Sequence, residues 1–108
     1  MAQTVFIEAI NQAISEEMRR DENVFIMGED IRRAVYGATA DLLGEFGEKR
    51  VRDTPLSENG FFGAAIGASL VGMRPIVETL TSFMWVGMDQ LISQAAKMRY
   101  MFGGQATL

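Results

Sequence analysis

Residues 50–78 read RVRDTPLSENGFFGAAIGASLVGMRPIVE, and this stretch decides the fold. The short run 51–54 is suited to a strand, and Pro55 closes it because proline cannot donate to a strand ladder. Ser57 then stands where a cap is expected for a helix over about residues 58–71. A strand followed directly by a helix predicts one half of a parallel crossover unit.

Outward from this stretch, strands and helices keep alternating. Further strands are expected at 76–80, introduced by Pro75, and at 24–27, an apolar run ended by Gly28 that fits a strand buried on both faces. Apolar spacings of three and four predict helices at 5–18 with Thr4 as N-cap, at 40–46 with Thr39 as cap and Gly47 as stop, and at 85–101. The order α-β-α-β-α-β-α predicts an α/β fold, a three-layer parallel sheet with helices on both faces.

The composition narrows the possible functions. A chain of 108 residues, 48% of them hydrophobic, has material for one globular core. Its net charge of −4 lacks the basic surface that nucleic acid requires, so no nucleic-acid partner is expected. The absence of cysteine and histidine excludes disulfides, thiolate or histidine metal sites and serine–histidine catalysis. No metal site is expected on this chain, and carboxylates remain the main candidates for acid–base chemistry.

The two ends of the chain also carry expectations. No apolar run approaches the roughly 20 residues that span a bilayer, and the start lacks a signal-peptide core, so we expect no membrane partner and a cytoplasmic location. The last residues, 105–108, resemble the beginning of another strand, so the fold is expected to be incomplete.

Acidic and aromatic residues follow the expected strands. Ligands of open parallel sheets bind outside the carboxyl ends of the strands, which here are followed by Glu29-Asp30, by Leu56-Ser57-Glu58 and by residues 81–83. Glu58 opens a helix with an apolar first turn, so it is a candidate catalytic carboxylate. By itself, the position also fits an ordinary acid in a first helical turn.

Two glycines, Gly63 and Gly67, lie on one face of the same helix. A glycine inside a helix costs about 1 kcal/mol relative to alanine, so a compensating close contact is expected. That contact is either packing within the domain or contact with another subunit.

A family resemblance rests on these residues and their surroundings. Glu58, Gly63-Ala64 and Gly67-Ala68 match the glutamate–glycine motif of thiamine-diphosphate enzymes. The wider stretches FIMGEDI at 25–31, residues 50–78, and MDQLISQAAKMRYMFGGQ at 88–105 resemble the β subunits of 2-oxo-acid and acetoin dehydrogenases. By this resemblance, residues 1–108 form the N-terminal part of a transketolase-like pyrimidine-binding domain, with the C-terminal domain of the family absent.

The resemblance implies an enzyme that decarboxylates a 2-oxo acid or cleaves acetoin and passes the acyl group to lipoamide. Glu58 would hydrogen-bond N1′ of the aminopyrimidine of thiamine diphosphate and favour the imino tautomer that generates the reactive ylide. Phe83 would pack on the pyrimidine, although residues 78–83 are one residue shorter than the family pattern. Leu56 and Glu29 complete the expected cofactor-binding set, and Glu29 fits either a hydrogen-bond network or a solvated loop.

The resemblance also implies partners. The glycine-aspartate-glycine motif that binds diphosphate and Mg²⁺ in this family is absent here, so an α subunit would hold both, in an α2β2 assembly with a second β subunit. The full-length protein would contact a dihydrolipoyl acyltransferase core. The loop 31–38 is shorter and less glycine-rich than the family pattern, with Arg32 and Arg33 where glycine is often found, which would alter substrate access. By resemblance, the short loop favours the acetoin type.

Two other functions remain open at this level. The chain fits a non-catalytic interaction module that self-associates through the Gly63 and Gly67 face. It also fits a flavodoxin-like domain that binds phosphate at the helix N-terminus after Ser57.

Overall fold

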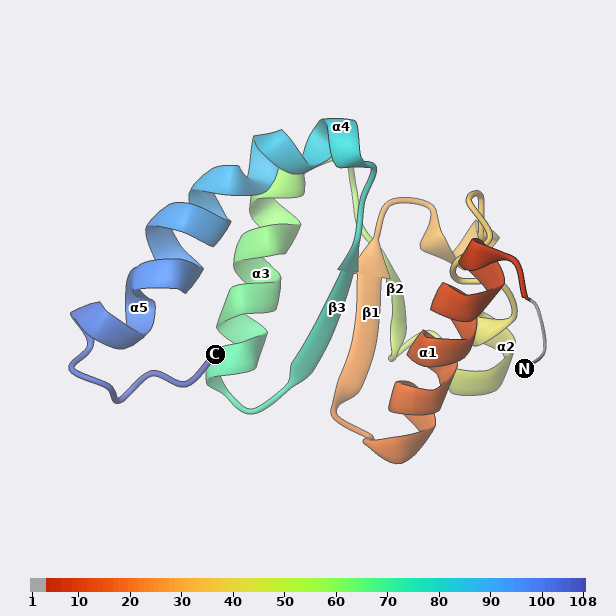
Figure 1. The fold of residues 1–108 in the computed structure, drawn as a ribbon, viewed down its shortest axis with the longest axis horizontal. Coiled ribbons are helices and arrows are strands. Elements are labelled where there is room, and N and C mark those ends of the chain that lie inside the picture. Colours follow the sequence, from red (N-terminus) through yellow and green to blue (C-terminus); the bar gives the residue numbers. More distant parts are fainter. Residues whose placement is uncertain (1–3) are drawn as a thin grey trace.

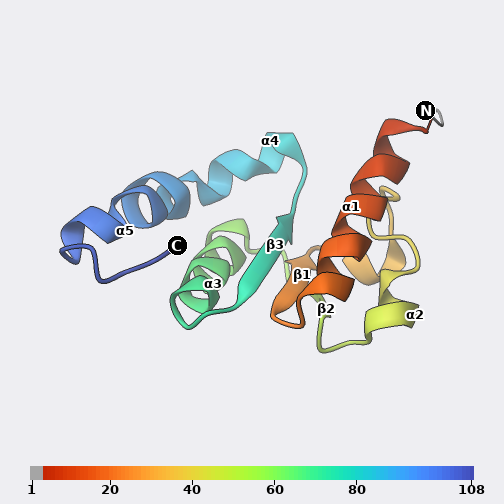
Figure 2. The ribbon, with the colours of Figure 1, turned by 60° about the horizontal axis from the view of Figure 1, so that its bottom comes forward.

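A parallel sheet between helices forms the centre of the molecule. The computed structural model describes residues 4–108. Within them one sheet has the order β2-β1-β3, and its strands are β1 (Val24–Gly28), β2 (Val51–Asp53) and β3 (Arg74–Glu78). Helices α1 (Phe6–Arg20) and α2 (Leu42–Phe46) lie on one side of the sheet, and α3 (Glu58–Leu70) lies on the other (Figures 1 and 2). The predicted three-layer α/β fold is therefore confirmed.

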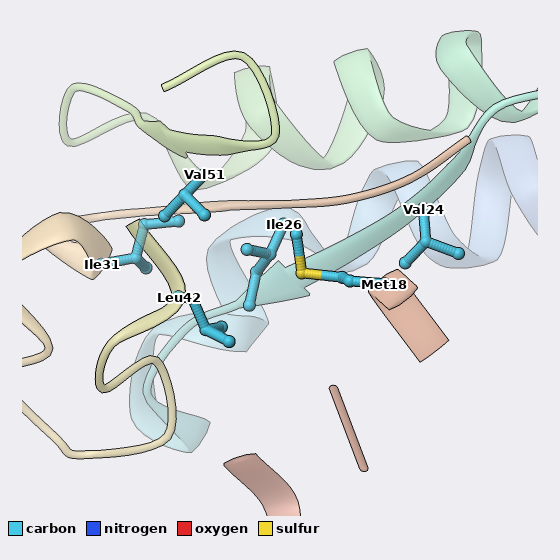
Figure 3. Close-up of a cluster of buried hydrophobic side chains, with 6 residues drawn as sticks. All are labelled: Met18, Val24, Ile26, Ile31, Leu42 and Val51. Atoms are coloured by element: carbon cyan, nitrogen blue, oxygen red, sulfur yellow. The ribbon is translucent and has the colours of Figure 1, made fainter. Parts of the chain in front are cut away.

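The main apolar core fills the space between the sheet and α1. Ile26 of β1 and Val51 of β2 are register partners, and both are fully buried. Met18 of α1 packs onto them, as Figure 3 shows together with the rest of the cluster, Val24, Ile31 and Leu42. Full burial of one such side chain contributes about 1.5–3 kcal/mol, so this cluster is the chief stabilising element on this side of the sheet.

Arg50 ties this core together from its edge. Its guanidinium donates hydrogen bonds to the carbonyl oxygens of Met18 (2.6 Å), Asp21 (2.9 Å) and Val24 (2.7 Å). The Met18 carbonyl lies in the last turn of α1, where carbonyls lack partners within the helix, so the Arg50 side chain supplies the missing donor. The same guanidinium lies 5.1 Å from the centre of the Phe46 ring.

The carboxyl ends of β1 and β3 meet at Gly28. Gly28 and Glu78 are register partners, and a Cβ atom built on Gly28 would collide with the carbonyl oxygen of Glu78. Only glycine permits this approach of one backbone to another.

Strand β3 begins earlier and ends earlier than the predicted range 76–80. The Arg74 amide donates to the carbonyl of Asn23 at 2.9 Å, so alternate residues from Arg74 onward face β1. The ring nitrogen of Pro75 therefore faces the outer edge of the sheet, where its missing N–H breaks no bond to β1, and the strand includes this proline. Leu80 is the N-cap of the next helix instead of a strand residue.

The last helix is longer and less regular than the predicted range 85–101. It starts with α4 (Thr81–Met84), passes through the 3₁₀ turn η2 (Trp85–Gly87) and the π-helical segment η3 (Gln90–Ala95), and ends with α5 (Ala96–Met101). This helical stretch runs along α3 on the side away from the sheet (Figures 1 and 2). Among residues 4–108, no helix is both long and apolar enough to cross a membrane.

Helix starts differ most from the predictions. Val5, not Thr4, is the N-cap of α1, and the Thr4 hydroxyl donates to Glu8 at 2.9 Å. The predicted helix 40–46 begins only at Leu42, because the Thr39 hydroxyl is buried and donates to the carbonyl of Ile31 at 2.7 Å instead of capping. Ser57 is the N-cap residue of α3, but its hydroxyl donates to the carbonyl of Pro55 at 3.1 Å. The hydroxyls of Thr39 and Ser57 donate to carbonyls of nearby loops instead of capping helix amides, and a cap motif in the sequence does not reveal this competition.

We expect Gly28→Ala to lower the free energy of unfolding by about 1–3 kcal/mol, the usual cost of overpacking, because the added methyl group meets the Glu78 carbonyl. Gly44→Ala is the matched control. Gly44 lies in α2, and no described atom lies within 4 Å of a Cβ built there, so alanine should be tolerated or stabilising. Urea unfolding compares the variants, and equal stability of the two would contradict the close approach.

Candidate functional site

A pocket of about 320 Å³ opens at the carboxyl ends of β1 and β3. Three of the predicted cofactor-binding residues, Glu29, Leu56 and Phe83, line it. Glu58, the predicted catalytic carboxylate, is not among the lining residues. The remaining lining residues come from the loop after β1 and from the end of β3: Asp30, Val35, Tyr36, Glu78, Thr79 and Leu80.

The carboxyl group of Glu29 in the pocket has a buried oxygen atom and a raised pKa. Its Oε1 atom is buried and has no hydrogen-bond partner within residues 4–108. Burial raises the pKa of the Glu29 carboxyl, and the neighbouring charge of Glu58 raises this pKa further, whereas the backbone of Ser57 lowers it. Glu58 therefore lies close to Glu29 at the first turn of α3, beside the pocket.

Glu78 is a site residue that the sequence did not reveal. It was assigned to the interior of a strand, but it is the last residue of β3 and lies opposite Gly28. Its side chain is half-buried, and this burial raises the pKa of its carboxyl. The position of Glu78 at the pocket depends on the register of β3 against β1, and a single sequence does not specify this register.

The loop after β1 is held in an uncommon conformation. Asp30 and Ala34 both adopt the left-handed region, with φ of 53° and 52°, on either side of the 3₁₀ turn η1 (Ile31–Arg33). Arg32 anchors the turn to β2, because its amide donates to Asp53 Oδ1 at 2.9 Å and its Nε donates to the carbonyl of Val51 at 3.0 Å. The arginine noted in the sequence thus fixes a loop that lines the pocket.

The pocket lining combines acceptors with apolar walls. Glu29, Asp30 and Glu78 supply carboxylates, whereas Leu80 and Phe83 supply apolar surface. Among the described residues, no lysine or arginine lines the pocket, and no three potential metal ligands converge. This chemistry suits a flat ligand that carries N–H donors, and it disfavours a phosphate group.

The two glycines of the α3 face differ in their surroundings. A Cβ built on Gly63 would lie 3.1 Å from the side-chain oxygen of Gln90, so Gly63 packs against η3 within the chain. For Gly67, no described atom lies within 4 Å of such a Cβ. Close packing within the domain therefore accounts for Gly63 alone.

Comparisons with known proteins agree with this arrangement. Residues 3–107 match the family described as transketolase, pyrimidine binding domain. The pyruvate dehydrogenase E1 component subunit beta of Rhizobium meliloti (strain 1021) is 48% identical over 108 residues, which cover 97% of this chain and 24% of the relative. The 2-oxoisovalerate dehydrogenase subunit beta of Bacillus subtilis (strain 168) is 51% identical over 98 residues, which cover 88% of this chain and 30% of the relative.

The name of a third relative describes a reaction of acetoin instead of a 2-oxo acid. The acetoin:2,6-dichlorophenolindophenol oxidoreductase subunit beta of Bacillus subtilis (strain 168) is 45% identical over 114 residues, covering 92% of this chain and 33% of the relative. The chain thus spans about a quarter to a third of the length of these curated relatives.

We expect Glu58→Gln to lower the pKa of Glu29, because removing a nearby negative charge favours the ionised form of its neighbour. The pH dependence of the Glu29 carboxyl resonance in NMR spectra measures this change. Glu22→Gln removes the same charge from an exposed turn and should leave the Glu29 titration unchanged. An identical Glu29 pKa in both variants would show that Glu58 and Glu29 do not interact.

We expect Glu78→Gln to stabilise the protein at neutral pH. Burial raises the pKa of Glu78 in the folded state, so wild-type stability falls as pH rises through that pKa, whereas glutamine does not ionise. The gain should disappear below the unfolded pKa of about 4.3. Urea unfolding between acidic and neutral pH tests this, with Glu22→Gln as control. A gain independent of pH would contradict the assigned cause.

Proposed function

Because the chain belongs to the transketolase pyrimidine-binding domain family, we propose that its pocket binds the aminopyrimidine of thiamine diphosphate. The chain would then act as the β-subunit portion of a thiamine-diphosphate-dependent dehydrogenase component. Glu58 is the proposed catalytic carboxylate, and Glu29, Leu56 and Phe83 are the proposed cofactor-binding residues. The observation that carries this proposal is the unpartnered Oε1 of Glu29 beside Glu58.

The residues of the pocket fit the pyrimidine part of this cofactor. An aminopyrimidine is flat and carries an exocyclic amino group, so it needs apolar walls and hydrogen-bond acceptors. Leu56 and Phe83 offer apolar surface, and a buried carboxylate oxygen without a partner would gain a hydrogen bond from such a donor. The diphosphate finds no cationic group among the described lining residues, which supports the proposal that a partner α subunit holds it together with Mg²⁺.

Each proposed residue has a distinct role. Glu58 would share a proton with the ring nitrogen N1′ of the pyrimidine, from the first turn of a helix whose position the sheet fixes. Glu29, whose raised pKa keeps a larger protonated fraction, would hold or return a proton beside it. Phe83 would orient the ring and exclude water from that face. When bound, the cofactor supplies an electron sink for decarboxylation or carbon–carbon cleavage.

The relatives define the range of proposed substrates. Their names include pyruvate, 2-oxoisovalerate and acetoin, and we propose a substrate of this 2-oxo-acid or acetoin class. We further propose transfer of the acyl group to lipoamide, an α2β2 assembly with a second β subunit, contact with a dihydrolipoyl acyltransferase core, and a cytoplasmic location. The loop carrying Val35 and Tyr36 at the pocket is the part of this chain best placed to affect substrate access.

In the full-length protein assembled with its α subunit, we expect Glu58→Gln to reduce turnover of the preferred substrate by a factor of about 10²–10⁴, the usual contribution of a positioned acid–base group. Assembly should be unchanged, because the substitution keeps the size of the side chain. Steady-state rates with pyruvate, 2-oxoisovalerate and acetoin measure the effect, and Glu22→Gln serves as control. Full activity of Glu58→Gln would remove Glu58 from the catalytic role.

A further inference from the structure

Phe62 of α3 packs directly against Gly87 of the following helical stretch. Gly87 is buried in η2, and a Cβ built on it would lie 2.5 Å from Cδ2 of Phe62 and 2.9 Å from both Cε2 and Cγ. No side chain fits at position 87 while the Phe62 ring keeps its place. The two elements are therefore separated by one aromatic ring resting on bare backbone.

The ring of Phe62 has little freedom to move aside. Its exposed fraction is only 7%, and it stacks on Phe61 with ring centres 5.5 Å apart and an angle of 25° between the ring planes. Moving the ring would break this stacking or open a void between α3 and the following helical stretch. Any group added at Gly87 would displace the helical stretch more readily than it would displace Phe62.

This contact lies close to two site residues along the chain. Phe62 follows Glu58 by four residues in α3, which is about one helical turn. Gly87 follows Phe83 by four residues within one helical stretch, again about one turn. The contact of Phe62 with Gly87 therefore lies about one helical turn from Glu58 on α3 and about one turn from Phe83 on the following helical stretch.

We propose that Phe62 and Gly87 are a positioning pair that sets the distance between Phe83 and Glu58 for cofactor binding. This inference rests on the proposed function and adds two residues that lie outside the pocket lining. A methyl group at position 87 would push η2 away from α3 and carry Phe83 outward. Glu58 would stay in place, because α3 also packs on β3.

A glycine on the other side of the sheet supplies a matched control. Gly44 lies in α2, and a Cβ there meets no described atom within 4 Å, so Gly44→Ala makes the same chemical change without a collision. The double variant Gly87→Ala/Phe62→Ala removes every ring atom that the new methyl group would meet. It should therefore allow the two helices to return to their original spacing.

The experiment measures thiamine diphosphate affinity of the full-length protein assembled with its α subunit, by calorimetric titration in the presence of Mg²⁺. We expect Gly87→Ala to raise the dissociation constant at least about tenfold, with a smaller loss of kcat at saturating cofactor. Gly44→Ala should stay within about twofold of wild type, and the double variant within about threefold. Thermal unfolding of each assembly accompanies the titrations.

The outcomes separate this inference from the function on which it rests. A wild-type assembly that binds no thiamine diphosphate would overturn both. If the wild type binds, an affinity of Gly87→Ala equal to that of Gly44→Ala would overturn the positioning pair alone. Should Gly87→Ala fail to assemble, the double variant decides. Recovered assembly with near wild-type affinity supports the pair, whereas a double variant that also fails or binds at least tenfold more weakly overturns it.

Discussion

The close approach of β1 and β3 at Gly28 is the constraint on which the rest of the site depends. Because no side chain separates the two strand ends, Glu29, which follows β1, and Glu78, the last residue of β3, line one pocket. Glu29 and Glu78 reach that pocket from different strands, and α3 brings Glu58 near it. A wider separation of the strands would expose the carboxyl groups of Glu29 and Glu78, and burial would no longer raise their pKa values.

The two faces of the sheet contribute differently, one mainly to stability and the other to the candidate site. On the α1 side, the cluster around Met18 and Ile26, together with the Arg50 hydrogen bonds, provides stability without contributing any lining residue of the pocket. On the α3 side, the helices approach each other closely at two glycines. Gly63 lies against the side-chain amide of Gln90, and Gly87 lies against the ring of Phe62. Burying carboxyl groups costs free energy, and the core on the opposite face offsets that cost. A site with unfavourable local electrostatics can therefore persist in a small domain.

Sequence patterns predicted the architecture and much of the site, because both follow from periodicity and strand order. Glu29, Leu56 and Phe83 could be placed at one edge since parallel strands end on the same side. Glu78 was missed, because its place depends on strand register and on where β3 ends. Thr39 was misassigned, because its hydroxyl satisfies a buried carbonyl far from the helix start. The irregular segments η2 and η3 pack against α3, and local propensity did not predict their departure from α-helical spacing.

The orientation of Pro75 has a consequence for how the molecule behaves at high concentration. Within residues 4–108, β3 is one of the two outer strands of the sheet, and such a strand offers its free backbone groups to any extended chain that comes near. At Pro75 the outward position carries a ring instead of an N–H, so an incoming strand finds an acceptor there but no donor. Indiscriminate edge-to-edge pairing, the first step of fibrous aggregation, is thereby disfavoured by a residue that costs the sheet itself no hydrogen bond.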